Sequence, residues 1–170
     1  KDNLTKDNQE IITGYYLVTK VIDGDTIEIN TSQRVRLICI DTPEIGQPYY
    51  NEAKNYLSGL ILNKEVSLEE DISETDKYGR LLRYAYLQNG DFVNELIVLN
   101  GYGKAYPYNP DISKCPIIEN AENIARSNKI GIWEIIEEEI QESGYICSSN
   151  YYNCGDFSSY SEALSVFNAC

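Results

Sequence analysis

Apolar and polar residues alternate with a period of two along several short stretches of the chain, and this alternation predicts β-strands. In the stretch 33–40, Val35 and Leu37 would lie on one face of a strand and Arg36 on the other. Upstream, the Asp-Gly pair at 23–24 favours a hairpin-type turn between two strands. Five strands are therefore expected, two within 15–31 and one each at 33–40, 65–68 and 80–87.

Three further stretches repeat apolar residues at helical spacing, and helices are expected at 50–62, 92–99 and 117–127. Ala53, Leu57 and Ile61 share one face of the first helix. Asp91 is the expected N-cap of the second, and Gly101 follows its end. The third would bury four apolar residues on one face: Ile118, Ala121, Ile124 and Ala125. Five short strands with interleaved helices suit an α+β fold, a five-stranded oligonucleotide/oligosaccharide-binding (OB) β-barrel with three helices.

A cation and two carboxylates lie on or directly after the third expected strand. Arg36 lies part-way along it, Asp41 and Glu44 follow at its exit, and Pro43 stops sheet pairing there because it has no N–H to donate. A guanidinium suits a phosphate, and carboxylates suit a hard metal ion. The chain contains no histidine, which excludes an imidazole-based zinc or iron site and a catalytic histidine.

Three short motifs follow one another along the chain: IDGDTI at 22–27, RVRLICIDTPE at 34–44 and TDKYGR at 75–80. In this order and at these separations they resemble the staphylococcal nuclease (thermonuclease) family. Shorter matches downstream extend the resemblance, which covers roughly residues 16–134: VNEL at 93–96, AY at 105–106 and GIW at 131–133. The family's fold is the same five-stranded OB barrel.

The resemblance implies a calcium site. Its ligands would be the carboxylates of Asp25 and Asp41 and the backbone carbonyl of Thr42, with Asp23 as a further acidic residue close to the metal. Calcium takes six to eight oxygen ligands in proteins, which agrees with such a set. Taken alone, the segment 23–25 would be interpreted as an ordinary hairpin turn, and only the other motifs favour the metal site.

The resemblance also implies three catalytic residues. Arg36 and Arg80 would grip the scissile phosphate, because the planar guanidinium donates two hydrogen bonds to phosphate oxygens and stays charged. Glu44 would handle the attacking water, either as a general base or by orienting it, and the sequence leaves both roles open. The structural alternative for Arg36 is an ion pair at the rim of the barrel, for instance with Glu28.

Four further residues match positions that bind the substrate in the family. Lys77 and Tyr78 match residues that hold the phosphate flanking the cleaved bond, and Tyr106 and Tyr108 match tyrosines that stack on nucleobases. Stacking tolerates any base and is worth about 1–3 kcal/mol per base. With 15 tyrosines in the chain, many others must be ordinary core or surface residues.

The resemblance thus implies a calcium-dependent phosphodiesterase, an endonuclease or exonuclease that acts on DNA and RNA, prefers single strands and leaves 3′-phosphates. We expect a secreted or cell-surface monomer with no membrane span. Two alternatives belong to other classes: a non-catalytic barrel that binds nucleic acid or protein, and a calcium-binding surface module. The presence of Asp25, Arg36, Asp41, Glu44 and Arg80 argues against loss of catalysis.

The net charge of −13 has the opposite sign from that of most nucleic-acid-binding proteins. Much of the excess lies in residues 134–170, which contain seven acidic residues and no basic ones. We therefore expect weak non-specific DNA affinity with a small salt dependence. The expected organisation is a flexible N-terminal arm at 1–12, the barrel domain at 13–134, an acidic linker or helix at 135–144 and a small tail at 145–170.

The five cysteines suggest two different environments. Cys39 lies in an apolar strand and is expected to be a buried free thiol, whereas Cys115 is expected in a loop. Cys147, Cys154 and Cys170 cluster near the C-terminus, as in small extracellular disulfide modules, and Cys154–Cys170 is the favoured pair. This tail resembles the first half of an excalibur-type extracellular module and lacks the calcium-loop half.

Overall fold

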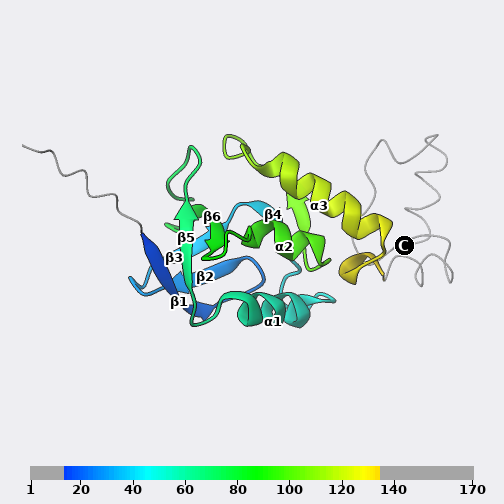
Figure 1. Cartoon of the computed structure of the whole chain (residues 1–170), viewed down its shortest axis with the longest axis horizontal. Helices are drawn as coiled ribbons and strands as arrows, with labels where there is room; N and C mark the ends of the chain where they lie inside the picture. The colour runs from blue at the N-terminus through cyan, green and yellow to red at the C-terminus, as the bar shows by residue number, and fades with distance from the viewer. Residues whose placement is uncertain (1–13, 135–170) are drawn as a thin grey trace, which may run out of the picture.

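Five strands close into a barrel in the computed structural model, which describes residues 14–134 (Figure 1). Around the barrel the order is β1 (Tyr15–Val21), β2 (Thr26–Ile29), β3 (Arg34–Leu37), β6 (Leu81–Leu87) and β5 (Glu65–Glu69). All neighbouring pairs are antiparallel except β3 and β6, which run parallel. The expected OB-type barrel with three helices is confirmed.

The parallel pair explains how two distant arginines come together. Val35 of β3 is in register with Leu81, the first residue of β6. Arg80 therefore enters β6 beside the strand that carries Arg36. Antiparallel pairing on the other side of β3 places Thr26 opposite Arg36. The barrel thus brings one residue from each of the three sequence motifs to the same edge.

The expected strand 33–40 is in fact two strands separated by a bend. After β3 ends, the N–H of Ile38 makes a hydrogen bond to the carbonyl of Arg83 at 3.1 Å, and Cys39 then takes a left-handed φ of 62°. For a residue other than glycine this conformation costs roughly 1–2 kcal/mol. Beyond the bend, β4 (Cys39–Asp41) leaves the barrel and pairs with β7 (Lys104–Tyr106), a strand that the sequence did not predict.

The helices lie close to the predicted positions: α1 (Tyr50–Ile61), α2 (Val93–Leu99), α3 (Cys115–Ser127) and the 3-10 turn η1 (Gly131–Trp133). Three details of the prediction were wrong. Phe92, not Asp91, occupies the N-cap of α2, and α3 begins at Cys115, which is therefore not a loop residue. Ile118, Ala121 and Ala125 are buried as predicted, but the side chain of Ile124 is 42% exposed because it lies beside the face of α3 that packs on the core.

A disulfide joins Cys39 at the start of β4 to Cys115 at the start of α3, so the predicted free thiol at Cys39 was wrong. The two cysteines are 76 residues apart in the sequence, and no local pattern pairs them. Both are almost completely buried in the same core cluster as the barrel interior. The predictions for the arm 1–12, the linker 135–144 and the tail, including Cys154–Cys170, concern residues outside the described part of the chain.

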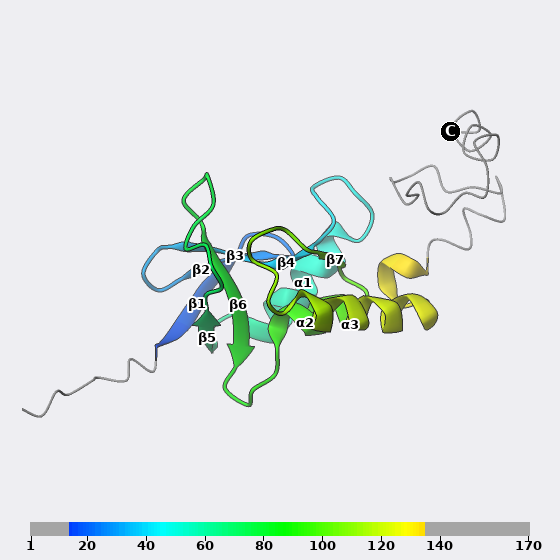
Figure 2. The same ribbon diagram turned by 90° about the horizontal axis from the view of Figure 1, so that it is seen from above.

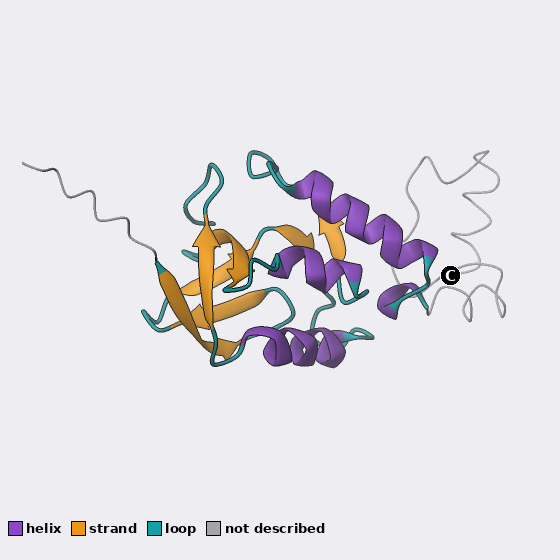
Figure 3. Cartoon of the chain, in the orientation of Figure 1, coloured by secondary structure: helices purple, strands orange, loops and turns teal. Residues whose placement is uncertain are grey.

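The barrel strands gather at one end of the molecule and the helices at the other, with the β4–β7 pair lying among the helices (Figure 3). In the view from above, the loops that follow β4, β5 and β7 lie on the same side of the molecule (Figure 2). These loops contain Glu44, the segment 75–80 and Tyr108. Within residues 14–134, no helix has the length and apolar character needed to cross a membrane.

Candidate active site

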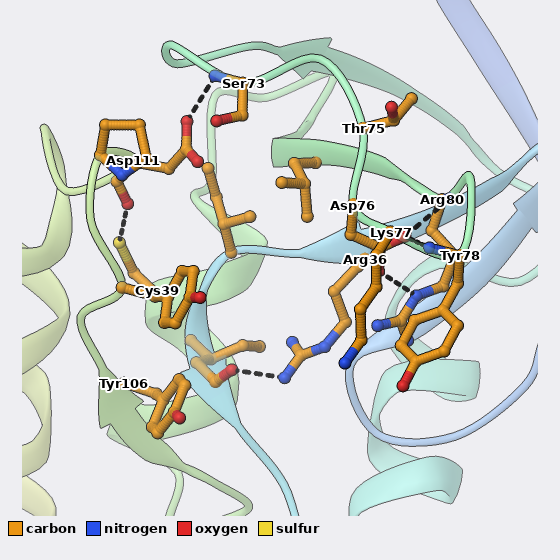
Figure 4. Close-up of a pocket in the computed structure, with 15 residues that line it drawn as sticks. Arg36, Cys39, Ser73, Thr75, Asp76, Lys77, Tyr78, Arg80, Tyr106 and Asp111 are labelled. Carbon is orange, nitrogen blue, oxygen red and sulfur yellow. Dashed lines mark hydrogen bonds and ion pairs between the residues drawn. The ribbon is translucent and has the colours of Figure 1, made fainter.

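A pocket of about 510 Å³ opens between the β3–β4 bend, the loop before β6 and the segment from β7 to residue 111. Figure 4 shows Lys77, Tyr78 and Arg80 beside Arg36 at one side of the pocket, and Tyr106 with Asp111 at the other. Six predicted site residues line it: Arg36, Lys77, Tyr78, Arg80, Tyr106 and Tyr108. The fold therefore brings the phosphate-binding and base-stacking candidates into one cavity.

The carboxylate of Asp25 lies next to this pocket in a buried hydrogen-bond network. Its Oδ2 accepts hydrogen bonds from the backbone N–H of Thr42 at 3.2 Å and from the Thr42 hydroxyl at 3.1 Å, and its Oδ1 accepts from the Thr26 hydroxyl at 3.0 Å. Burial raises the pKa of Asp25 from its usual 3.8 to about 7; the Arg36 cation opposes this rise and Asp23 adds to it. The site thus holds a carboxylate in surroundings that favour a cationic partner.

Close packing of the turn before Asp25 requires a glycine. A Cβ at Gly24 would lie 2.6 Å from the hydroxyl oxygen of Thr42 and 2.9 Å from the Cβ of Ala53. Such distances are far below ordinary van der Waals contact, so any larger residue would push the turn away from Thr42. Asp23 supports the same turn, because its Oδ1 accepts a hydrogen bond from the N–H of Asp25 at 3.1 Å.

Arg36 connects the pocket to the carboxylates. Its Nη2 lies 3.1 Å from Oδ2 of Asp25 and 3.5 Å from Oδ1 of Asp41. The guanidinium also donates hydrogen bonds to the carbonyls of Leu37 and Ile40 at 2.5 and 2.9 Å. The alternative partner Glu28 is in register with Arg34 instead. Arg36 therefore lines the pocket and also contacts the carboxylates of both Asp25 and Asp41.

The donor set around Arg36 fits a hard divalent cation. Two carboxylates approach one guanidinium nitrogen, Asp23 adds a third negative charge nearby, and Thr42 lies between them in the network. In the described part of the chain, no three acidic, cysteine or histidine side chains converge on one point. Two carboxylates would form an open site completed by a backbone carbonyl, waters or substrate, as calcium and magnesium accept.

Arg80 is held by an acidic residue of its own motif. Its Nε donates to Oδ2 of Asp76 at 2.7 Å, and Oδ1 of Asp76 accepts from the N–H groups of Tyr78 and Arg80 at 2.9 and 3.0 Å. Burial alone would raise the pKa of Asp76, but the hydrogen bonds and charge of Arg80 outweigh it and lower that pKa. Nη1 of Arg80 lies 3.4 Å from the Thr26 hydroxyl, which links Arg80 to Asp25.

The three candidate tyrosines have large exposed faces. Tyr78, Tyr106 and Tyr108 are 72%, 52% and 69% exposed, whereas Tyr84 of the barrel strand β6 is fully buried. The Nζ of Lys77 lies 5.0 Å from the ring centre of Tyr78 and the guanidinium carbon of Arg80 lies 5.6 Å from it, so this ring is flanked by cations. Exposed rings beside cations suit a ligand that carries both bases and phosphates.

Glu44 lies apart from these residues. It is exposed on the loop after β4 and does not line the pocket; its backbone N–H donates to the side-chain oxygen of Gln47 at 2.7 Å. The fold thus brings Arg36, Asp25, Asp41 and Thr42 together and leaves Glu44 at the edge of the site.

Two aspartates of the site region were missed from the sequence. Asp76 lies inside the TDKYGR motif, four residues before Arg80, and this spacing could have suggested the ion pair. Asp111 is buried, and its Oδ1 accepts from the N–H groups of Ile72 and Ser73 at 2.9 and 2.7 Å. It fastens the loop before β6 to the segment after β7, and nothing in the local sequence indicates this contact.

Comparison with known proteins agrees with this geometry. A family model described as staphylococcal nuclease homologue matches residues 34–135. The chain is 40% identical over 128 residues to a thermonuclease of Staphylococcus intermedius, covering 70% of this chain and 76% of the relative. It is 38% identical over 127 residues to a thermonuclease of Staphylococcus hyicus (69% and 75%), and 36% identical over 120 residues to an uncharacterized endonuclease of Escherichia coli O157:H7 (68% and 74%).

Proposed function

The chain belongs to the family of staphylococcal nuclease homologues, and from this premise we propose that it is a calcium-dependent nuclease. It hydrolyses phosphodiester bonds in DNA and RNA, prefers single strands and leaves 3′-phosphates. The main observation behind the proposal is that Arg36 both lines the pocket and forms ion pairs with Asp25 and Asp41. A phosphate bound there meets a fixed cation next to the oxygen ligands suited to a metal.

Asp25, Asp41 and the backbone carbonyl of Thr42 would hold the calcium ion, with Asp23 close by. When bound, calcium supplies positive charge for the phosphoryl oxygens and favours ionisation of a bound water. The hydrogen bonds from Thr42 and Thr26 fix the orientation of the Asp25 carboxylate before any ligand arrives. This preorganisation lowers the cost of reorganising the site during the reaction.

Arg36 and Arg80 hold the scissile phosphate. Each guanidinium carries five N–H donors, so the ion pairs of Arg36 and Arg80 and the hydrogen bonds of Arg36 to two carbonyls leave donors on each one for a phosphate. Hydrogen bonds that strengthen as the phosphorus becomes pentacovalent raise the rate rather than only the affinity. Lys77 and Tyr78, on the same loop as Arg80, hold the neighbouring phosphate.

Glu44 acts on the attacking water from the edge of the site. Its exposed position on the loop after β4 leaves the carboxylate in contact with solvent. From there it can act as a general base or by orienting the water. Measuring how the rate depends on pH in a Glu44→Gln variant would separate the two roles.

A preference for single strands follows from the exposed tyrosines. Tyr106 and Tyr108 can stack only on bases that are not already stacked and paired within a duplex. We also propose that the protein acts as a monomer that is secreted or held at the cell surface. A buried disulfide between Cys39 and Cys115 is typical of proteins that mature in an oxidising compartment.

Digestion of denatured DNA with added calcium, compared with the same reaction in a chelator, tests the proposal. Cleavage should require calcium and should fall by orders of magnitude in Arg36→Ala and Glu44→Gln. Arg34→Ala, an exposed arginine two residues away on the same strand, is the matched control and should cleave like the wild type. Cleavage that survives chelation would overturn the metal assignment. Binding of calcium or DNA without any cleavage would favour the two non-catalytic alternatives.

A further inference from the structure

The Cys39–Cys115 disulfide lies at the boundary of the pocket. Cys39 is the first residue of β4 and lines the pocket, and Cys115 is the first residue of α3. Figure 4 shows Cys39 between Tyr106 and Asp111, and its sulfur lies 3.3 Å from the carbonyl oxygen of Asp111. The cross-link therefore joins the pocket-lining Cys39 to the start of α3, four residues after Asp111, which also lines the pocket.

Cys39 is also the residue at which the chain turns out of the barrel. Its left-handed φ of 62° redirects the chain so that β4 pairs with β7 and not with a barrel strand. Asp41 follows two residues later, and Tyr106 is the cross-strand partner of Cys39 itself. The direction of this bend therefore decides where a candidate metal ligand and a candidate stacking residue lie.

Hydrogen bonds fix the carbonyl groups on both sides of the bend. Arg36 donates to the carbonyls of Leu37 and Ile40, and the buried side chain of Asn94 donates to the carbonyl of Ile38 at 2.9 Å. Cys39 itself, which has the unfavourable conformation, is held through its side chain by the covalent bond to α3. The disulfide and the hydrogen bonds thus constrain the same four-residue segment from different sides.

We propose that the Cys39–Cys115 disulfide is a positioning element of the active site: it holds the left-handed bend so that Asp41 faces Asp25 across Arg36 and Tyr106 faces the pocket. The cysteines act through Asp41 and Tyr106, and so they are positioning residues. This inference rests on the proposed function, because it assigns Asp41 to calcium and Tyr106 to the substrate. It predicts that the disulfide affects calcium affinity and kcat as well as the stability of the fold.

The variant Cys39→Ala/Cys115→Ala tests the proposal at a temperature well below its unfolding transition. Calcium affinity, measured by calorimetry, should fall at least about fivefold, and kcat on denatured DNA at least about tenfold, because small misplacements of catalytic groups have large effects on rate. Val66→Ala is the matched control. Val66 is fully buried in β5 on another part of the barrel, so its truncation should lower Tm and leave both quantities unchanged.

A second variant, Cys39→Gly/Cys115→Ala, separates the bend from the cross-link. Glycine adopts a positive φ without steric cost, so part of the lost calcium affinity should return, to an intermediate loss of about two- to fivefold. Calcium affinity and kcat within twofold of the wild type in the alanine variant would overturn the proposal. If the alanine variant does not fold, wild-type values in the glycine variant would overturn it in the same way.

The two readouts distinguish this inference from the proposed function. A wild-type protein that binds calcium but does not cleave DNA would contradict the nuclease function, and the calcium titrations of the variants would then still decide the role of the disulfide. A wild type that cleaves, together with variants that bind calcium and cleave equally well, would overturn the inference alone. A wild type that neither binds calcium nor cleaves would overturn both.

Discussion

The candidate active site has two sides that meet at Arg36, and they differ in exposure to solvent. The carboxylate side contains Asp25 and Thr42, which are 6% and 5% exposed, and each is held by several hydrogen bonds. On the nucleotide side, Tyr78 and Tyr108 are 72% and 69% exposed. Apart from the half-exposed Asp41, the carboxylate side is buried and oriented before a ligand arrives, whereas the nucleotide side presents open surfaces.

This difference indicates a division of labour. Buried groups that are oriented in advance stabilise charge that develops in the transition state, and so they affect kcat. Exposed rings add binding energy that is similar in the ground and transition states, and so they affect KM. Four variants test this division, from the largest expected effect to the smallest.

Arg36→Lys should have the largest effect, on the side of the carboxylates. Lysine keeps the charge but has one nitrogen, whereas Arg36 binds the carbonyl of Leu37 through Nη1 and reaches Asp25 and Asp41 through Nη2. We expect kcat on denatured DNA to fall roughly 10²–10³-fold, as for the loss of a preorganised donor, with a much smaller change in KM. Steady-state kinetics would check this. A change confined to KM would contradict the idea that the carboxylate side affects kcat and the nucleotide side affects KM.

Asp76→Asn should weaken the link between the two sides. Asparagine can still accept hydrogen bonds from the N–H groups of Tyr78 and Arg80, but it loses the ion pair with the Arg80 guanidinium. We expect kcat to fall about tenfold because Arg80 is less well oriented. Glu74→Gln, at an exposed position of the same loop, is the control and should leave kcat unchanged. Equal kcat in both variants would show that Asp76 does not position Arg80.

The fold was largely predictable because most of its elements carry their own periodic pattern. The four strands β1, β2, β5 and β6 and all three helices begin and end within about two residues of the predicted positions. The β3–β4 bend and β7 were missed for a physical reason. β7 has only three residues, too few for a period, and its partner is determined by the left-handed turn at Cys39, which no residue preference signals.

The candidate site was predictable where a short motif carries it. Arg36, Lys77, Tyr78 and Arg80 come from two motifs and line one pocket. Contacts that depend on the distant chain could not be predicted: the Cys39–Cys115 bond spans 76 residues, and Asp111 binds backbone groups that belong to another loop. Such contacts arise from tertiary packing and leave no period or spacing in the sequence.

Tyr106→Ala tests the nucleotide side directly. Removing a ring that is half exposed and lines the pocket should raise KM for denatured DNA roughly fivefold, at the lower end of the range for a stacking residue. Tyr106→Phe keeps the ring and should behave like the wild type, which separates stacking from hydrogen bonding. A fall in kcat without a change in KM would show that Tyr106 contributes to the catalytic step and not to substrate binding.

The open side nevertheless depends on hydrogen-bonded anchors, and Asp71→Asn should reveal one of them through a change in stability alone. Oδ2 of Asp71 accepts hydrogen bonds from the N–H of Ser113 at 2.9 Å and the hydroxyl of Tyr84 at 3.0 Å. Burial raises the pKa of Asp71, but these hydrogen bonds and the charge of Lys114 outweigh it, and the net pKa lies below its usual 3.8. The carboxylate therefore stabilises the fold fully above pH 3.8, and this contribution is lost as the pH falls through the folded-state pKa.

Near neutral pH, Asp71→Asn should lower the free energy of unfolding by about 1 kcal/mol, the order expected for weakening a charged hydrogen bond. As the pH falls below 3.8 and through the lowered folded-state pKa of Asp71, the difference from the wild type should shrink, because the wild-type carboxyl then becomes uncharged like the asparagine side chain. Urea unfolding at several pH values would measure this, with kcat and KM taken well below the transition. If the variant also raised KM, Asp71 would control the shape of the nucleotide side as well as its stability. The loops that carry the tyrosines would then belong to the fixed part of the site, and only the tyrosine side chains would remain as open surface.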